Sequence, residues 1–198
     1  MKVPRRDGFA TRAPMNLFGW LKGSSRRDTS ALDEWRVSWS SAVEGGDSLD
    51  AGLRQQLDTL ASSEGDLEIE LEMLDGLDQL RAVQQAVAAG TMPSVETHHR
   101  VIGREACHFS APSSLATEQA QASGRVLLTG TRAVFVGGGR TSATAWHAVH
   151  DIGRLERDVL LVRPDRSVAA HLRFNTYGDA VVCAFLSRQL KGSRRSSL

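Results

Sequence analysis

Apolar residues recur every three or four positions through the first half of the chain and at every second position through much of the second half. The first spacing is typical of an amphipathic helix, and the second of a strand with one buried face. We therefore expect an α+β protein, with helices up to about residue 92 and a β-rich part from about residue 104.

Three helices are predicted between residues 30 and 92. Ser30 to Asp33 has the form of a capping box, Gly45-Gly46 ends the first helix, and Asp47-Ser48 can cap the second. The third covers about 66–89 and ends at Gly90. The short connections favour an antiparallel helical hairpin or a three-helix layer. The expected buried stripes are Leu32, Trp35, Trp39 and Val43; Leu49, Leu53, Leu57 and Leu60; and Ile69, Met73, Leu77, Leu80, Val83 and Val87.

The β-rich part contains a complete hairpin signal. Two apolar runs flank Gly130-Thr131, and glycine at the first central position supplies the positive φ of a type II′ turn. A second strand pair, at 158–163 and 168–174, is joined by a turn at Pro164 to Ser167. Thr176 to Asp179 is a capping box that opens a C-terminal helix. Counting outward from the first turn pairs Leu128 with Ala133, Leu127 with Val134 and Val126 with Phe135.

The net charge of +1 hides a strongly uneven distribution of charge along the 198 residues. Residues 1–27 carry +6, residues 28–100 carry −11, and residues 101–198 carry +6. Such asymmetry predicts separate parts. We expect a disordered basic segment at 1–29 with Met1 or Met15 as its start, an acidic helical module at 30–92, a β domain at 104–190 and a disordered tail at 191–198.

The third predicted helix begins with six acidic residues and no basic residue before Arg81. One interpretation is a solvated face, and the other is a docking face for something basic, including the arginine-rich half of the chain itself. The six are Asp66, Glu68, Glu70, Glu72, Asp75 and Asp78.

Several short features between residues 104 and 190 occur in a fixed order. They are His108 to Pro112, Gly124 to Thr129, Arg132 to Phe135, Gly137 to Gly139, Asp151-Ile152, and Phe174 before the last helix. In this combination the chain resembles the bacterial branch of the pleckstrin-homology (PH) and GRAM-like domains. The resemblance implies a strongly bent seven-stranded antiparallel sheet or barrel, capped by the C-terminal helix. It also implies a non-catalytic module that binds phosphoinositides, peptides or proteins.

Lipid-binding members of that family carry clustered basic residues between the first two strands, whereas Ser113 to Ser123 contains Glu118 and no basic residue. Phosphoinositide binding at that stretch is therefore not expected, and a protein partner is the first expectation. The planar fork of arginine can hold either a carboxylate or a phosphate in a bidentate manner. The arginines expected to bind the partner are Arg125, Arg132, Arg140, Arg154 and Arg173.

A second interpretation is peripheral contact with an anionic membrane through residues 15–27 and the arginine-rich β surface. Phe18, Trp20, Leu21 and Lys22 would make that contact, with docking of this segment on the protein's own surface as the alternative. No apolar run approaches the roughly 20 residues that span a bilayer. The expected location is cytoplasmic, or peripheral to the inner face of the membrane.

A third interpretation is an enzyme or metal site that uses His147 and His150 with Asp151. No HExxH or CxxC pattern accompanies them, so we expect no catalytic residue, metal or cofactor. Low aromatic content disfavours nucleic acid as a partner. Cys107 and Cys183 are expected to be buried free thiols.

Overall fold

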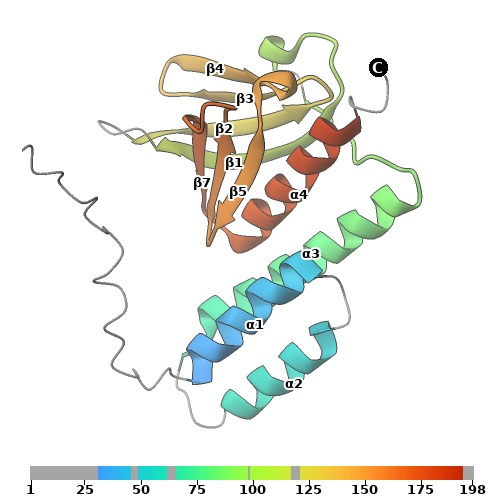
Figure 1. The fold of residues 1–198 in the computed structure, drawn as a ribbon, viewed down its shortest axis with the longest axis vertical. Helices are drawn as coiled ribbons and strands as arrows, with labels where there is room; N and C mark the ends of the chain where they lie inside the picture. Colours follow the sequence, from blue (N-terminus) through green and yellow to red (C-terminus); the bar gives the residue numbers. More distant parts are fainter. Residues whose placement is uncertain (1–30, 46–48, 62–65, 98, 117–120, 194–198) are drawn as a thin grey trace, which may run out of the picture.

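The computed structural model describes residues 31–45, 49–61, 66–97, 99–116 and 121–193 (Figure 1). Three helices precede a β-rich part that ends in a fourth helix, which confirms the α+β class. The helices are α1 (Ala31–Gly45), α2 (Asp50–Leu60), α3 (Glu68–Ala88) and α4 (Tyr177–Ser193). The strands are β1 (Cys107–Ala116), β2 (Gln121–Thr129), β3 (Arg132–Gly137), β4 (Arg140–Ala145), β5 (Asp151–Leu155), β6 (Asp158–Val162) and β7 (Val168–Phe174).

The seven strands form one antiparallel sheet in the order β4-β3-β2-β1-β7-β6-β5. In Figure 1, β2 to β4 run across the view while β5 and β7 run down it, so the sheet is strongly bent. Gly124 faces Gly137 in register, and a Cβ on Gly124 would lie 2.6 Å from the Gly137 Cα. Only glycine permits this approach of β2 to β3. The sheet stays open, with β4 and β5 at its edges, and is not a closed barrel.

The first hairpin has the predicted register but not the predicted turn. Leu128 pairs with Ala133, and the other two predicted pairs are also confirmed. Gly130 does not have a positive φ, so the type II′ turn was wrong. The Thr129 hydroxyl instead accepts hydrogen bonds from the backbone N–H groups of Thr131 (3.3 Å) and Arg132 (3.2 Å). A threonine side chain thus holds the turn that glycine was expected to make.

Two buried indoles join the three N-terminal helices. Trp35 Nε1 donates to the Leu53 carbonyl (2.9 Å) and Trp39 Nε1 donates to the Met73 carbonyl (2.7 Å), so α1 is bonded to both α2 and α3. Arg81 of α3 donates to Asp50 (2.7 Å) at the start of α2 and to the Ala42 carbonyl (2.8 Å). The predicted three-helix layer follows from these bonds.

The predicted stripe of α3 was wrong at its first position. Ile69 is 46% exposed, whereas the neighbouring Glu70 is only 1% exposed. The reason is Arg36 of α1, whose Nε and Nη2 donate to Glu70 at 2.8 and 2.5 Å. Arg36 compensates the charge of the buried Glu70 carboxylate, and Ile69 consequently faces outward.

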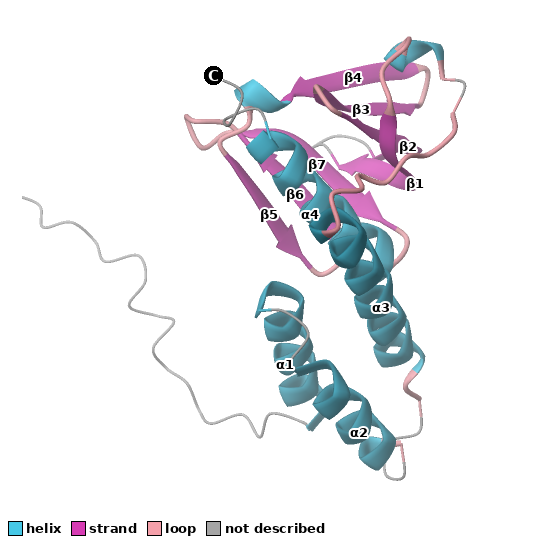
Figure 2. Ribbon diagram, turned by 90° about the vertical axis from the view of Figure 1, so that its right-hand side faces the viewer, coloured by secondary structure: helices cyan, strands magenta, loops and turns pink. Residues whose placement is uncertain are grey.

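Of the three N-terminal helices, α3 makes the main contact with α4, which packs on the sheet (Figure 2). At the crossing of α3 and α4, a Cβ on Gly76 would lie 2.8 Å from the Gly178 backbone nitrogen. Glu72 of α3 accepts from the Tyr177 N–H (2.8 Å) and from Arg157 (2.5 Å). One hydrophobic cluster extends from Trp39 through these helices into the sheet. The docking interpretation of the acidic run is therefore confirmed for Glu72.

Three further predictions concern the ends of helices α2 and α4. Thr176 Oγ1 accepts from the Asp179 N–H at 3.1 Å, which confirms the last capping box. The final helix continues to Ser193, two residues beyond the predicted start of the tail. Leu49, expected in a buried stripe, is 47% exposed at the N-cap position, just before the start of α2.

Candidate functional site

A cleft of about 650 Å³ lies between α1 and the turn that joins β5 to β6. Both ribbon views place this turn beside α1 (Figures 1 and 2). The cleft is lined by Trp39 of α1, Met73 of α3 and Tyr177 of α4. The Trp39 and Tyr177 rings meet edge to face, with centroids 5.6 Å apart. Such a lining of large apolar groups is typical of binding sites.

Two large apolar side chains that line the cleft are exposed to solvent. Val37 of α1 is 65% exposed and Leu155, at the end of β5, is 69% exposed. Glu156, the next residue, has a φ of +51°, a left-handed conformation that is uncommon for glutamate. The turn therefore places Leu155 beside the cleft at some cost in backbone strain.

Arg154 occupies an inward-facing position of β5. Because side chains alternate along a strand, it shares a face with the buried Ile152, opposite to Leu155. Its guanidinium carbon lies 5.1 Å from the centroid of the Trp39 ring, a cation–π contact. Burial lowers the pKa of Arg154 because it disfavours the charged form.

The polar contacts of Arg154 are incomplete. Its Nη1 donates to the Glu156 carbonyl at 3.2 Å, while its Nε, which solvent does not reach, has no hydrogen-bond partner. None of the ion pairs within the described residues includes Arg154. Glu44, which lines the same cleft, attracts Arg154 electrostatically without a direct ion pair. The cleft therefore contains a partly desolvated cation that has no direct ion-pair partner among the described residues.

The neighbouring arginines differ in this respect. Arg36 is paired with Glu70 at 2.5 Å and Arg157 with Glu72 at 2.5 Å. Arg188 lies 3.3 Å from Glu44, which also lines the cleft. Each of these three arginines has a direct ion pair, and Arg154 differs from them in that respect, although the buried Nε of Arg157 also has no hydrogen-bond partner.

A second hollow, of about 410 Å³, continues from the cleft and shares Glu156 and Tyr177 with it. Arg157 lies over the Tyr177 ring, 4.7 Å from its centroid. Arg173 donates two hydrogen bonds to Asp158, at 2.8 and 2.9 Å, and these hold the pKa of Asp158 below its usual value. The two hollows together form a groove that exposes Ile69, Val37 and Leu155.

The five arginines predicted to bind a partner do not form one surface. Arg154 and Arg173 line the two hollows of the groove. Arg125, on β2, donates to Ser110 at 3.1 Å, and Arg140 is exposed at the start of the edge strand β4. The structure thus brings together only the two that belong to the β5–β7 half of the sheet.

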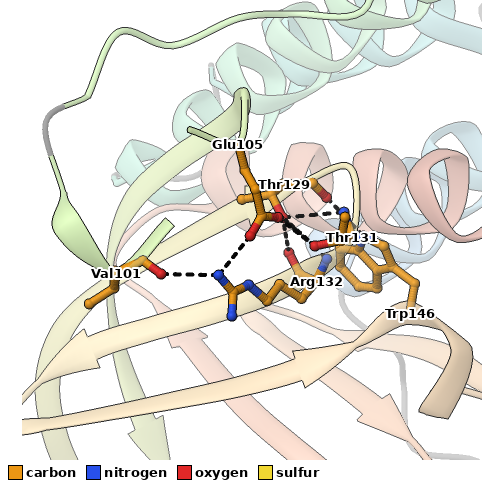
Figure 3. A network of polar contacts seen from close by, with 6 residues as sticks. All are labelled: Val101, Glu105, Thr129, Thr131, Arg132 and Trp146. Atoms are coloured by element: carbon orange, nitrogen blue, oxygen red, sulfur yellow. Dashed lines mark hydrogen bonds and ion pairs between the residues drawn. The ribbon is translucent and has the colours of Figure 1, made fainter. Parts of the chain in front are cut away.

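Arg132 belongs to a separate polar network at the first hairpin (Figure 3). Its Nη2 donates to Glu105 (2.6 Å) and to the Val101 carbonyl (3.1 Å). Glu105 also accepts from the hydroxyls of Thr129 (2.6 Å) and Thr131. Burial alone would raise the pKa of Glu105, but the hydrogen bonds of both threonines and the charge of Arg132 outweigh it and lower that pKa. The network anchors the turn to the segment before β1.

The other predicted sites have the following positions. His147 is exposed in a short 3-10 segment (Trp146–Ala148), and the His150 carbonyl accepts from Lys191 at 2.6 Å. The described part of the chain contains no group of three or more His, Cys, Asp or Glu side chains arranged to hold a metal ion. Cys107 and Cys183 are buried free thiols, as expected. Phe18, Trp20, Leu21 and Lys22 lie outside the described residues.

None of the described helices is both long and apolar enough to cross a membrane.

Sequence reasoning identified Arg154 but missed the rest of the cleft. Trp39 was assigned to the buried stripe of α1, and Val37 and Leu155 were assigned no role. The strand that carries Arg154 and Leu155 was not predicted as such, because its five residues contain only two large apolar ones. The inward position of Arg154 could have been recognised from its spacing. Arg154 follows Ile152 by two positions, and in a strand this spacing places both side chains on the same face.

No protein-family profile and no curated protein matches this chain. Among solved structures, similarity exists to the C-terminal domain of an unknown protein from Leishmania infantum, with 13% identity, a TM-score of 0.40, and coverage of 46% of this chain and 88% of the other. A human RhoA complex with the DH/PH fragment of PDZRHOGEF has 11% identity and a TM-score of 0.39, and Vav1 bound to an allosteric inhibitor has 8% and 0.39. Both alignments cover 82% of this chain, which spans 52% and 45% of those chains.

Proposed function

We propose that the chain is a non-catalytic protein-binding module, made of a PH-like sheet with its C-terminal helix and an N-terminal helical extension. Two properties of the chain support the PH-like part: seven antiparallel strands in the order β4-β3-β2-β1-β7-β6-β5, and a helix directly after the last strand. The partner's contact segment binds in the cleft between α1 and the β5–β6 turn.

The observation that carries this proposal is the exposure of Val37 and Leu155 beside an aromatic floor. Exposed aliphatic side chains cost free energy in water, and their gathering around a cleft indicates an interaction site more than a scattered distribution would. A volume of about 650 Å³ is within the range of sites that hold a small ligand or a few side chains, roughly 300–1,000 Å³. It therefore fits a short linear segment of a partner protein.

Site-specific photo-crosslinking in extracts of the native cells tests the proposal. A photo-reactive amino acid is placed at Val37, with Val168 as the control position. Val168 is 51% exposed and begins β7, at the end of the β6–β7 ladder away from the cleft. We expect a specific crosslinked product from position 37 that Leu155→Asp abolishes and Val168→Asp leaves unchanged. Equal products from both positions would contradict the proposal.

Membrane binding is an outcome of a parallel measurement. If full-length chain floats with phosphatidylserine vesicles, position 37 yields no protein crosslink, and Leu155→Asp has no effect on flotation, the membrane interpretation replaces the protein-binding one.

A further inference from the structure

We propose that Arg154 is the receptor for a carboxylate side chain of the bound segment, so that the cleft selects acidic and apolar residues side by side. This inference rests on the proposed function and names the chemistry of its partner. It starts from the difference between Arg154 and the arginines around it.

A guanidinium that is partly removed from water loses hydration free energy, which an ion pair or full hydrogen bonding normally offsets. For Arg36, Arg157 and Arg188, glutamates of this chain supply that compensation. For Arg154, the compensation within the described residues is the Trp39 ring, one carbonyl and the attraction of Glu44, with which it makes no direct ion pair. An anion that enters the cleft would find there a cation that has no direct ion pair.

The cation–π contact with Trp39 positions Arg154 for this role. Attraction to the face of the ring limits the positions that the guanidinium takes. The group is therefore oriented before the ligand arrives, which reduces the entropy lost on binding. A carboxylate matches the fork of an arginine in a bidentate manner.

The charges around the cleft favour a carboxylate over a phosphate. Glu44 and Glu156 line the same cleft as Arg154. Their negative charges oppose a doubly charged phosphate more strongly than a singly charged carboxylate. Val37 and Leu155 also require apolar groups next to the anion, and a peptide with adjacent acidic and apolar residues supplies both.

The test uses a random dodecapeptide phage library panned against the immobilised full chain. We expect the enriched peptides to contain Asp or Glu within one or two positions of a large apolar residue. Synthetic copies of these peptides should bind Arg154→Gln about 10- to 100-fold more weakly, because a charge-assisted hydrogen bond to a partly buried group is lost. Arg154→Lys retains the charge without the fork and should give an intermediate loss.

The matched control is Arg163→Gln, which removes an exposed arginine at the far end of β6 and should leave affinity unchanged. Thermal melts of each variant check that it folds. Peptides that lose affinity with Val37→Asp but show no acidic enrichment and no response to Arg154→Gln would overturn the inference about Arg154 and leave the cleft as the site. Absence of any peptide that depends on Val37 would overturn the proposed function together with it.

Discussion

The close approach of Gly76 in α3 to Gly178 in α4 predicts that a larger side chain at position 76 destabilises the packing of these two helices. A Cβ at position 76 would lie 2.8 Å from the Gly178 nitrogen and 2.9 Å from its Cα, both backbone atoms. Carbon atoms in ordinary contact are about 3.5–4.0 Å apart, so Gly76→Ala would push α3 away from α4 by up to about 1 Å. Overpacking of this kind costs roughly 1–3 kcal/mol.

Alanine also favours the helix over glycine by up to about 1 kcal/mol, which opposes that cost. Gly52→Ala in α2 separates the two effects, because nothing lies within 4 Å of a Cβ at that position. The difference between the two variants then reports the helix contact, and we expect Gly76→Ala to be less stable by about 1–3 kcal/mol.

Urea unfolding of the full chain, followed by tryptophan fluorescence, measures both free energies of unfolding. In thermal melts, the same difference corresponds to about 2–4 °C for each kcal/mol. If Gly76→Ala proves as stable as Gly52→Ala, then α3 and α4 do not pack at this distance, and the cleft that depends on this packing loses its support.

Two further predictions concern the acidic side chains. The folded state lowers the pKa of Glu105, so its stabilising contribution is complete above the pKa of the unfolded chain, about 4.3, and is lost as the pH falls through the lower folded value. Glu105→Gln should therefore flatten the loss of stability below about pH 5 in acid titrations. An unchanged slope would contradict this. Glu72→Gln removes a partly exposed ion pair with Arg157, so we expect the free energy of unfolding in urea to fall by about 0–1 kcal/mol at low salt and by less at 1 M salt. An equal decrease at low and high salt would exclude the electrostatic explanation.

Local sequence patterns predicted those parts of the fold that depend on neighbours along the chain. The register of Val126 with Phe135 and the cap at Thr176 follow from spacing alone, and both are confirmed. The turn at Gly130 failed because Thr129 offered the backbone a competing acceptor. Glycine preference was a weaker influence there than a side-chain hydrogen bond.

Features that depend on distant segments could not be predicted in this way. Glu70 is buried in place of Ile69 because Arg36 lies 34 positions earlier on a helix that packs against it. The cleft likewise combines Trp39, Arg154 and Tyr177 from three elements, and no period along the chain connects them. Arg154 was named from its residue type alone, whereas its lack of a direct ion pair among the described residues is a property of the folded arrangement.

Hydrogen exchange of the full chain with a selected dodecapeptide tests the central claim most directly. The cleft predicts that added peptide slows exchange in segments 35–44 and 151–159, which carry Val37 and Arg154, and leaves segment 113–123 unchanged. Protection confined to segment 113–123, which contains the end of β1 and the start of β2, would contradict the account.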